Sequence, residues 1–141
     1  MTFKDYKHFI PVQIRFHDID RLNHVNNACY MTYFESGRVD YFQKTLRDHI
    51  DWSKNGVVVA RSEINHIKPI HLNDEIFCFT KVVRFGNKSM TVENAILKKT
   101  ESDFILCAEG MGILVAMDYV NNKSIRVPDL WRSLIGEFET T

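Results

Sequence analysis

The sequence lacks an excess of charge of either sign. Its 141 residues include 18 basic and 18 acidic side chains, so the formal net charge is zero. General nucleic-acid binders usually carry a basic excess, and anchors for anionic membranes need a basic cluster, so both partner classes are disfavoured. The apolar fraction of 45% is ordinary for a soluble protein, and the length predicts a single domain over residues 1–141.

Long apolar runs, cysteine pairs and metal motifs are also missing. The longest apolar stretch, residues 110–117, has the length of a strand and is too short for a membrane span. The three cysteines, Cys29, Cys78 and Cys107, lack the spacing of redox or zinc motifs, which favours free thiols in a reducing cytoplasm. The histidines show no zinc spacing, and the mixed, charged N-terminus does not resemble a signal peptide. We therefore expect a cytoplasmic protein without a metal.

Glycine and proline are scarce, with six and three copies, so each one marks a particular feature. Gly86-Asn87 predicts a two-residue hairpin turn, and pairing Phe85 with Lys88 sets its register. Gly110 and Gly112 predict bulges inside a long strand. Pro128 predicts the first turn of a short C-terminal helix over residues 128–136.

Hydrophobic periodicity predicts an α+β order, a strand, a long helix, four strands and a short helix. Apolar residues crowd several faces of the long helix, residues 25–46, which indicates a buried central helix. Asn26 or Asn27 can cap its start, and Gly37 inside it predicts close approach to a sheet. A sheet that wraps this helix has uncovered edges, which predicts dimerisation. The strands are expected at residues 10–16, 57–68, 74–85, 88–99 and 105–119.

The polar segment before the long helix, residues 17–27, is the most informative part of the chain. It combines carboxylates, imidazoles and carboxamides just ahead of a helix start. Unpaired backbone N–H groups at a helix N-terminus can hold an oxyanion as charge develops on a carbonyl group. A carboxylate a few residues upstream can attack that carbonyl carbon, or activate a water molecule beside it.

The decapeptide at residues 18–27, Asp-Ile-Asp-Arg-Leu-Asn-His-Val-Asn-Asn, is followed by Tyr30, Phe34-Glu35 and Arg38. This pattern resembles the hotdog-fold acyl-CoA thioesterases of the 4-hydroxybenzoyl-CoA thioesterase type, and the resemblance extends over residues 12–115. It implies a five-stranded antiparallel sheet wrapped around a long central helix, with subunits paired as dimers or tetramers. It also implies hydrolysis of an acyl-CoA thioester, a small-molecule substrate, to a free acid and CoA, without a cofactor.

The resemblance aligns the catalytic aspartate of the family with Asp20, as a nucleophile or a general base. The backbone amide that polarises the substrate carbonyl aligns with about Asn27. His24, Val25 and Asn26, beside this amide, become candidate substrate-binding residues. Asn23 stands where the family usually has glycine or alanine, and asparagine tolerates the same left-handed backbone conformation.

Each of these residues also has a plainer interpretation. Asp20 could cap the helix or pair with Arg21, whereas Asp18 is expected to shape the loop through an Asx turn. We expect His24 to bond to Asp18 or Asp20 and to orient the carboxylate. A general-base role for His24 is the alternative.

Two residues of the helix have alternative roles as well. Glu35 is a candidate second acid or base, or the partner of Arg38 in an ion pair on the helix surface. Cys29 could serve as a nucleophile with His24, but a small buried apolar thiol is the favoured interpretation.

The hairpin register suggests where the CoA phosphates bind. It places Lys98 opposite Glu75 and Lys99 opposite Asp74, as favourable cross-strand pairs. Three basic residues near the turn are left without such a partner, namely Lys81, Arg84 and Lys88. They could contact the phosphates of CoA, or they could simply be solvated hairpin charges.

Two other functions remain open on this sequence. One is an acyl dehydratase or hydratase on the same fold, and the other is a non-catalytic acyl-CoA-binding protein. The residues do not settle the acyl group, the choice between CoA and acyl-carrier-protein thioesters, or the choice between dimer and tetramer.

Overall fold

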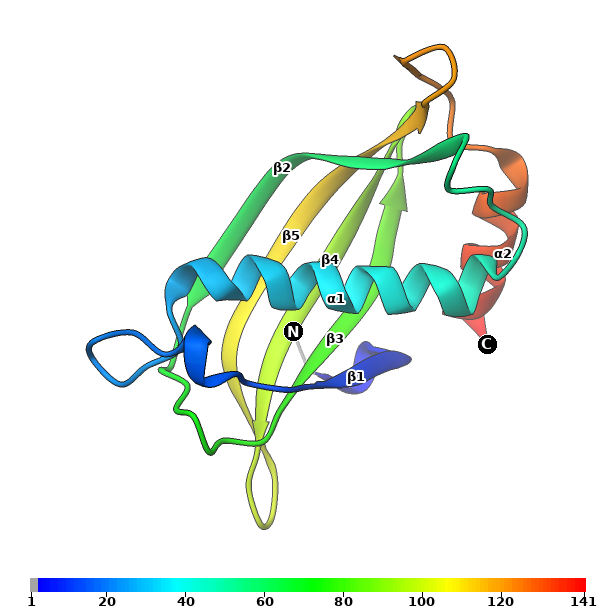
Figure 1. The fold of residues 1–141 in the computed structure, drawn as a ribbon. Coiled ribbons are helices and arrows are strands. Elements are labelled where there is room, and N and C mark those ends of the chain that lie inside the picture. Colours follow the sequence, from blue (N-terminus) through cyan, green and yellow to red (C-terminus); the bar gives the residue numbers. More distant parts are fainter. Residues whose placement is uncertain (1–2) are drawn as a thin grey trace.

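The computed structural model describes residues 3–141, which form one antiparallel sheet and two α-helices (Figure 1). The strand order is β1-β3-β4-β5-β2, and the two-residue strand β6 pairs with β5 as a sixth strand. The strands are β1 (His8–Val12), β2 (Asn55–His66), β3 (Ile76–Phe85), β4 (Ser89–Lys99), β5 (Phe104–Asp118) and β6 (Lys123–Ser124). The helices are α1 (Asn27–Leu46) and α2 (Asp129–Thr140), with 3₁₀ turns η1 (Phe3–Asp5) and η2 (Phe16–Asp18).

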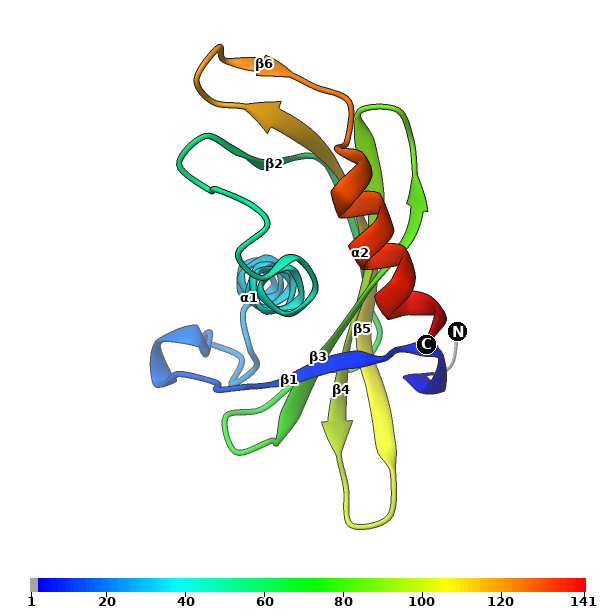
Figure 2. The same cartoon turned by 90° about the vertical axis from the view of Figure 1, so that its right-hand side faces the viewer.

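The long helix α1 lies against one face of the sheet, and the sheet curls around it. Seen end-on in Figure 2, α1 has β2 above it, β1 below it and the central strands β3, β4 and β5 to its right. A Cβ atom on Gly37 would lie 2.6 Å from Cys78 Sγ and 2.7 Å from Thr80 Oγ1, so the glycine permits this close approach. The predicted hotdog architecture and the predicted role of Gly37 are confirmed.

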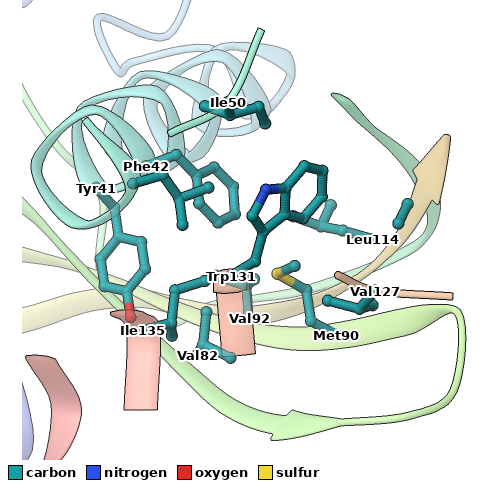
Figure 3. Packing of buried hydrophobic residues seen from close by; sticks show 12 residues of the cluster. Tyr41, Phe42, Ile50, Val82, Met90, Val92, Leu114, Val127, Trp131 and Ile135 are labelled. Carbon is teal, nitrogen blue, oxygen red and sulfur yellow. The ribbon is translucent and has the colours of Figure 1, made fainter. Parts of the chain in front are cut away.

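The C-terminal helix α2 is longer than the sequence predicts. Pro128 is its N-cap residue, and the helix continues past Gly136 to Thr140. Tertiary contacts explain the extra turn, because the Tyr41 hydroxyl on α1 donates a hydrogen bond to Glu139 and the Tyr41 ring packs edge-on against Phe138. In Figure 3 the Trp131 indole extends from α2 into the core. Its neighbours there include Phe42, Ile50, Met90, Val92 and Leu114.

The first strand differs from its prediction at both ends. It begins at His8 and stops at Val12, whereas residues 10–16 were expected to be extended. The Asp18 carboxylate accepts a hydrogen bond from the Arg15 backbone N–H at 3.0 Å, which turns the chain into η2. Apolar alternation alone could not reveal this local competitor for the strand.

The β3–β4 hairpin has a longer turn than the two residues predicted. Phe85 pairs with Met90 instead of Lys88, and the Gly86 N–H donates to the Ser89 carbonyl at 2.8 Å. A further register shift lies in β3 between residues 82 and 84.

The predicted cross-strand charge pairs are wrong as a result. Lys98 lies opposite Ile76, and its Nζ is 3.7 Å from Asp74 Oδ2. Lys81 also has partners, because its Nζ is 3.9 Å from Glu93 and lies over the ring of Tyr6.

The predicted bulges at Gly110 and Gly112 are wrong too, because β5 keeps its register with β2 across both glycines. The irregularity in β2 falls between Val59 and Arg61. Gly110 instead provides room, since a Cβ atom there would clash with the Glu63 carbonyl and lie 2.8 Å from the Phe34 ring. Neither helix in residues 3–141 is long and apolar enough to cross a membrane.

Candidate active site

The loop between η2 and α1 is held closed by its own backbone. The Asp20 N–H donates to the His24 carbonyl at 2.8 Å, and the Asn23 N–H donates to the Asp20 carbonyl at 3.0 Å. Asn23 has a φ of 64°, so the predicted left-handed position is confirmed. The loop therefore presents Asp20 on a tight, defined turn at the start of α1.

Only one oxygen of Asp20 is bound by this turn. Its Oδ1 accepts hydrogen bonds from the backbone N–H groups of Leu22 at 2.9 Å and His24 at 3.3 Å. The first of these is the bond of an Asx turn, so Asp20 makes the turn that was predicted for Asp18. Within residues 3–141 no hydrogen bond engages Oδ2, and Asp20 lines a surface hollow. The carboxylate is thus anchored by one oxygen and open to a reactant at the other.

Asp18, unlike Asp20, is buried, and its hydrogen bonds stabilise the loop. It is 1% exposed and accepts hydrogen bonds from the Tyr33 hydroxyl at 2.7 Å and from the Arg15 backbone and guanidinium. Burial alone would raise the pKa of Asp18, but these hydrogen bonds outweigh it and lower the pKa below its usual value. The Asp18 carbonyl also accepts from the Asn26 N–H at 2.8 Å, which ties the loop to the helix start.

The N-terminus of α1 offers an unused donor beside Asp20. Asn26 caps the helix, with its Oδ1 accepting from the Ala28 N–H at 3.0 Å, and its carbonyl accepts from the Cys29 N–H. For the Asn27 N–H, the described part of the chain supplies no acceptor. Such a group carries partial positive charge and is suited to a developing oxyanion.

A hollow of about 410 Å³ joins these elements. It brings together the predicted Asp20, His24, Val25, Asn26 and Asn27. Its other lining residues are Leu22, Tyr30, His66, Ile67, Lys68 and Pro69.

Sequence reasoning did not single out His66, whose ring lies edge-on to Tyr30 at a centroid distance of 4.7 Å. Its only sequence signal was a position two residues before Lys68-Pro69, a pair that belongs to the family-like pattern.

His24 contributes to the loop through its backbone. Its ring lies edge-on to His71 at a centroid distance of 5.1 Å, and in residues 3–141 it has no hydrogen bond to Asp18 or Asp20. The expected side-chain bond to either carboxylate is therefore wrong: the backbone N–H of His24 donates to Asp20, and its ring packs against His71.

Cys29 is poorly suited to act as a nucleophile. Its Sγ lies 3.8 Å from the Asp18 carbonyl, and burial together with the Asp18 charge raises the pKa of the thiol. All three cysteines are free, as predicted. Over residues 3–141 the histidine, cysteine and acidic side chains form no group of three that could hold a metal ion.

Glu35 lies in a second hollow of about 420 Å³, away from Asp20. Arg38 also lines this second hollow, but in the described residues no ion pair within 4.0 Å joins Glu35 and Arg38. Glu35 follows Asn27, at the start of α1, by eight residues, which correspond to roughly 12 Å of helix. A single subunit therefore does not bring Glu35 and Asp20 together.

The predicted phosphate-binding residues are distant from Asp20 within one subunit. Arg84 and Lys88 belong to the β3–β4 hairpin, at the opposite end of the sheet from the Asp20 loop in both views (Figures 1 and 2). Lys88 Nζ lies 3.5 Å from Ser124 Oγ.

Comparison with known proteins identifies the family. The model of the thioesterase-like superfamily matches residues 14–133, which include the Asp20 loop, α1 and β2 to β5. The chain belongs to the thioesterase-like superfamily. Thioester hydrolysis on a hotdog fold, predicted from the sequence, is confirmed at this level.

Two of three similar proteins are named as thioesterases, and the third is uncharacterized. A crystal structure of a Thermus thermophilus thioesterase complexed with coenzyme A and Zn is 31% identical, covers 98% of both chains and gives a TM-score of 0.84. The uncharacterized protein YsmA of Bacillus subtilis is 28% identical over 65% of this chain and 65% of its own length. The chloroplastic acyl-acyl carrier protein thioesterase ATL2 of Arabidopsis thaliana is 25% identical over 94% of this chain and 70% of its own length.

Proposed function

We propose that this thioesterase, acting as one domain over residues 1–141, hydrolyses acyl-CoA thioesters with Asp20 as its catalytic carboxylate. One observation carries the proposal: Asp20, which has one oxygen without a hydrogen bond in residues 3–141, and Asn27, whose N–H has no acceptor there, line the same hollow. A thioester carbonyl bound at the helix start would have a polarising donor on its oxygen and a carboxylate beside its carbon.

The reaction needs no other group from the chain. Asp20 either attacks the carbonyl carbon, giving a mixed anhydride that water then hydrolyses, or removes a proton from an attacking water. In both routes the C–S bond breaks and the electron pair leaves with the CoA sulfur. A thiolate is a good leaving group because ordinary thiols have a pKa of about 8.5, so no strong acid is required.

CoA is the proposed carrier of the acyl group, because the similar Thermus structure is described as complexed with coenzyme A. The ATL2 relative is described as acting on acyl carrier protein thioesters, which is the alternative to test. Arg84 and Lys88 remain the proposed contacts for the CoA phosphates, with His24, Val25 and Asn26 lining the path to Asp20.

We also propose that the functional unit is a homodimer formed through β2. This strand is twelve residues long, lies at the edge of the sheet, and residues 58–63 are all exposed. A long unprotected edge is a template for pairing with another strand. The other edge, β1, has five residues and contains Pro11, which lacks the N–H needed for pairing.

The sequence of β2 is self-complementary for antiparallel pairing. With the twofold axis at Ser62, Arg61 lies opposite Glu63 of the partner subunit, and the reverse pair repeats the contact. His66 then lies opposite Val58 of the partner subunit. The hollow with Asp20 is thereby placed next to the partner's second hollow, which Val57, Val59 and Glu35 border. Only in this arrangement could Glu35 act as a second acid or base.

The Asp20→Asn variant tests the proposed function. The amide keeps an oxygen for the Leu22 and His24 N–H groups but removes the nucleophile or base, so the fold should persist. We expect a loss of at least about a hundredfold in kcat for acyl-CoA hydrolysis, measured by release of free thiol. Asp51→Asn, a distant exposed substitution, is the control. Near wild-type turnover in Asp20→Asn would refute the assignment, and double-bond hydration without thiol release would favour the dehydratase.

A further inference from the structure

The end of β2 places His66 on the wall of the hollow that contains Asp20. His66 is the last residue of this strand and pairs with Ala108 of β5. Beyond it, the Ile67 N–H donates to the Cys107 carbonyl at 2.8 Å, which continues the attachment to β5. The backbone that carries His66 is therefore fixed to the sheet at the point where it borders the hollow.

The ring of His66 is oriented by the central helix. It lies edge-on to the Tyr30 ring, with 4.7 Å between the centroids, and Tyr30 is buried about one turn after Asn27. The His66 side chain is exposed, and in residues 3–141 nothing forms a hydrogen bond with its ring nitrogens. An imidazole with free nitrogens thus lines the same hollow as the helix start, where a thioester carbonyl would bind.

The other nitrogen and oxygen groups that titrate in this hollow are less suited to act as a base. Burial raises the pKa of Tyr30 to about 12, so its hydroxyl stays protonated at neutral pH. The ammonium group of a lysine such as Lys68 has no acceptor for a proton. The His24 ring packs against another imidazole, that of His71, whereas the His66 ring packs against the helix itself. His66 is therefore the base best placed beside the helix start.

We propose that His66 is the general base that takes a proton from water when the acyl intermediate on Asp20 is hydrolysed. The inference rests on the proposed function and selects the route in which Asp20 is the nucleophile. In the mixed anhydride the attacking oxygen of Asp20 is bonded to the acyl carbon, and the carboxylate charge is lost. Asp20 therefore no longer activates water at this stage, whereas an imidazole does so near neutral pH. Water also hydrolyses an anhydride unaided, so His66 raises the rate of a step that proceeds slowly without it.

The second step is balanced with His66 as the proton acceptor. A water oxygen bonds to the acyl carbon while one of its protons passes to a ring nitrogen of His66. The bond between the acyl carbon and Asp20 Oδ2 then breaks, and its electron pair restores the carboxylate. The imidazolium passes the proton to the CoA thiolate or to solvent, so one water is consumed for each acid and thiol formed. Throughout, Asp20 Oδ1 accepts from the Leu22 and His24 N–H groups, which keeps the turn intact.

The time course of thiol release tests this division of the reaction. The substrate is the ester that the wild type hydrolyses fastest among acetyl-, octanoyl-, palmitoyl- and benzoyl-CoA. His66→Phe keeps an aromatic ring against Tyr30, and His66→Gln keeps a polar side chain, but neither supplies a base. In both variants one equivalent of thiol per active site should appear at about the wild-type rate, because the first step does not use His66. The steady rate that follows should fall about a hundredfold.

The slow second step should also make the intermediate visible. Intact-mass spectrometry of either His66 variant during turnover should show one added acyl group, which peptide mapping places on Asp20. Asp20→Asn/His66→Gln should release no burst of thiol and carry no acyl group. His49→Gln, an exposed histidine beyond the end of α1, is the control and should match the wild type in both phases. Circular dichroism verifies that each variant is folded.

Three results would overturn the inference. They are wild-type turnover in both His66 variants, a burst that slows as much as the steady rate, and an acyl-enzyme that accumulates in His24→Gln or Glu35→Gln but not in the His66 variants. Each of these leaves the proposed function standing as long as Asp20→Asn abolishes hydrolysis. If the wild type hydrolyses none of the four esters, or Asp20→Asn keeps its turnover, the proposed function itself fails.

Discussion

Asp18 and Asp20 are separated by a single residue, yet their surroundings give them different roles. Asp18 is buried and receives hydrogen bonds from Arg15 and Tyr33, whereas Asp20 keeps one oxygen open to a hollow. The sequence distinguished them only through the family resemblance. Spacing alone could not, because the partner that buries Asp18 comes from the second turn of α1, fifteen residues away.

Asp18→Asn should destabilise the protein far more than its small chemical change suggests. The Asp18 carboxylate accepts hydrogen bonds from the Tyr33 hydroxyl, the Arg15 backbone N–H and the Arg15 guanidinium. An amide has only one accepting oxygen, so at least one of these donors loses its partner. We expect a loss of about 2 kcal/mol in the free energy of unfolding near neutral pH, measured with urea. Asp51→Asn, at an exposed turn, should change this free energy by less than about 0.5 kcal/mol.

The same carboxylate predicts a pH dependence of stability. The pKa of Asp18 is lower in the folded protein than in the unfolded chain, so its stabilisation is fully present above the unfolded pKa of about 3.9. It is lost as pH falls through the lower folded value. The difference in unfolding free energy between wild type and Asp18→Asn should therefore shrink in acid. A difference that stays constant across this pH range would contradict the assignment.

At the scale of elements, the sequence located the helices and most strands but placed several ends and registers wrongly. The β3–β4 turn and the end of β1 depend on hydrogen bonds that involve Ser89 and Asp18, which hydrophobic alternation does not register. The close approach of α1 to the sheet at Gly37 was predicted correctly. Glycine destabilises the interior of a helix, so a glycine there, away from either end, indicates tight packing against a neighbour.

Gly37→Ala and Gly136→Ala should have opposite effects. Alanine favours a helix by about 1 kcal/mol over glycine, but at position 37 its methyl would press on Cys78 and Thr80, which are fully buried. We expect Gly37→Ala to lower the unfolding free energy by about 1–2 kcal/mol. At Gly136 no atom lies within 4 Å of the new methyl, so Gly136→Ala should raise it by about 0.5–1 kcal/mol. Thermal unfolding of the two variants against wild type tests both signs.

At the scale of the whole molecule, the distribution of the two hollows argues for a dimer. Each subunit holds the carboxylate at one end of β2 and an apolar hollow with Arg38 at the other. The hollow with Asp20 holds the proposed reacting carboxylate, and the second hollow adds the apolar side chains of Val39, Phe42, Trp52 and Leu114.

A charge swap tests the β2 interface. Arg61→Glu places like charges opposite each other across the proposed twofold axis and should weaken the dimer, as should Glu63→Arg. The double variant restores opposite charges and should recover the dimer and the activity. Analytical ultracentrifugation with an acyl-CoA assay follows both. A protein that stays monomeric, or single variants that dimerise like wild type, would exclude this interface.

The sequence by itself determined the class of fold, the central helix and the loop that carries Asp20, because local patterns encode them. Apolar crowding indicates burial, Asn23 permits the left-handed turn, and Asn26 caps the helix. Only the tertiary structure decided which aspartate is buried, which hollow receives Glu35, and which basic residues lie near or far from Asp20. Those outcomes depend on contacts between segments far apart in the chain, such as Tyr33 with Asp18 and Lys81 with Glu93, which no local pattern contains.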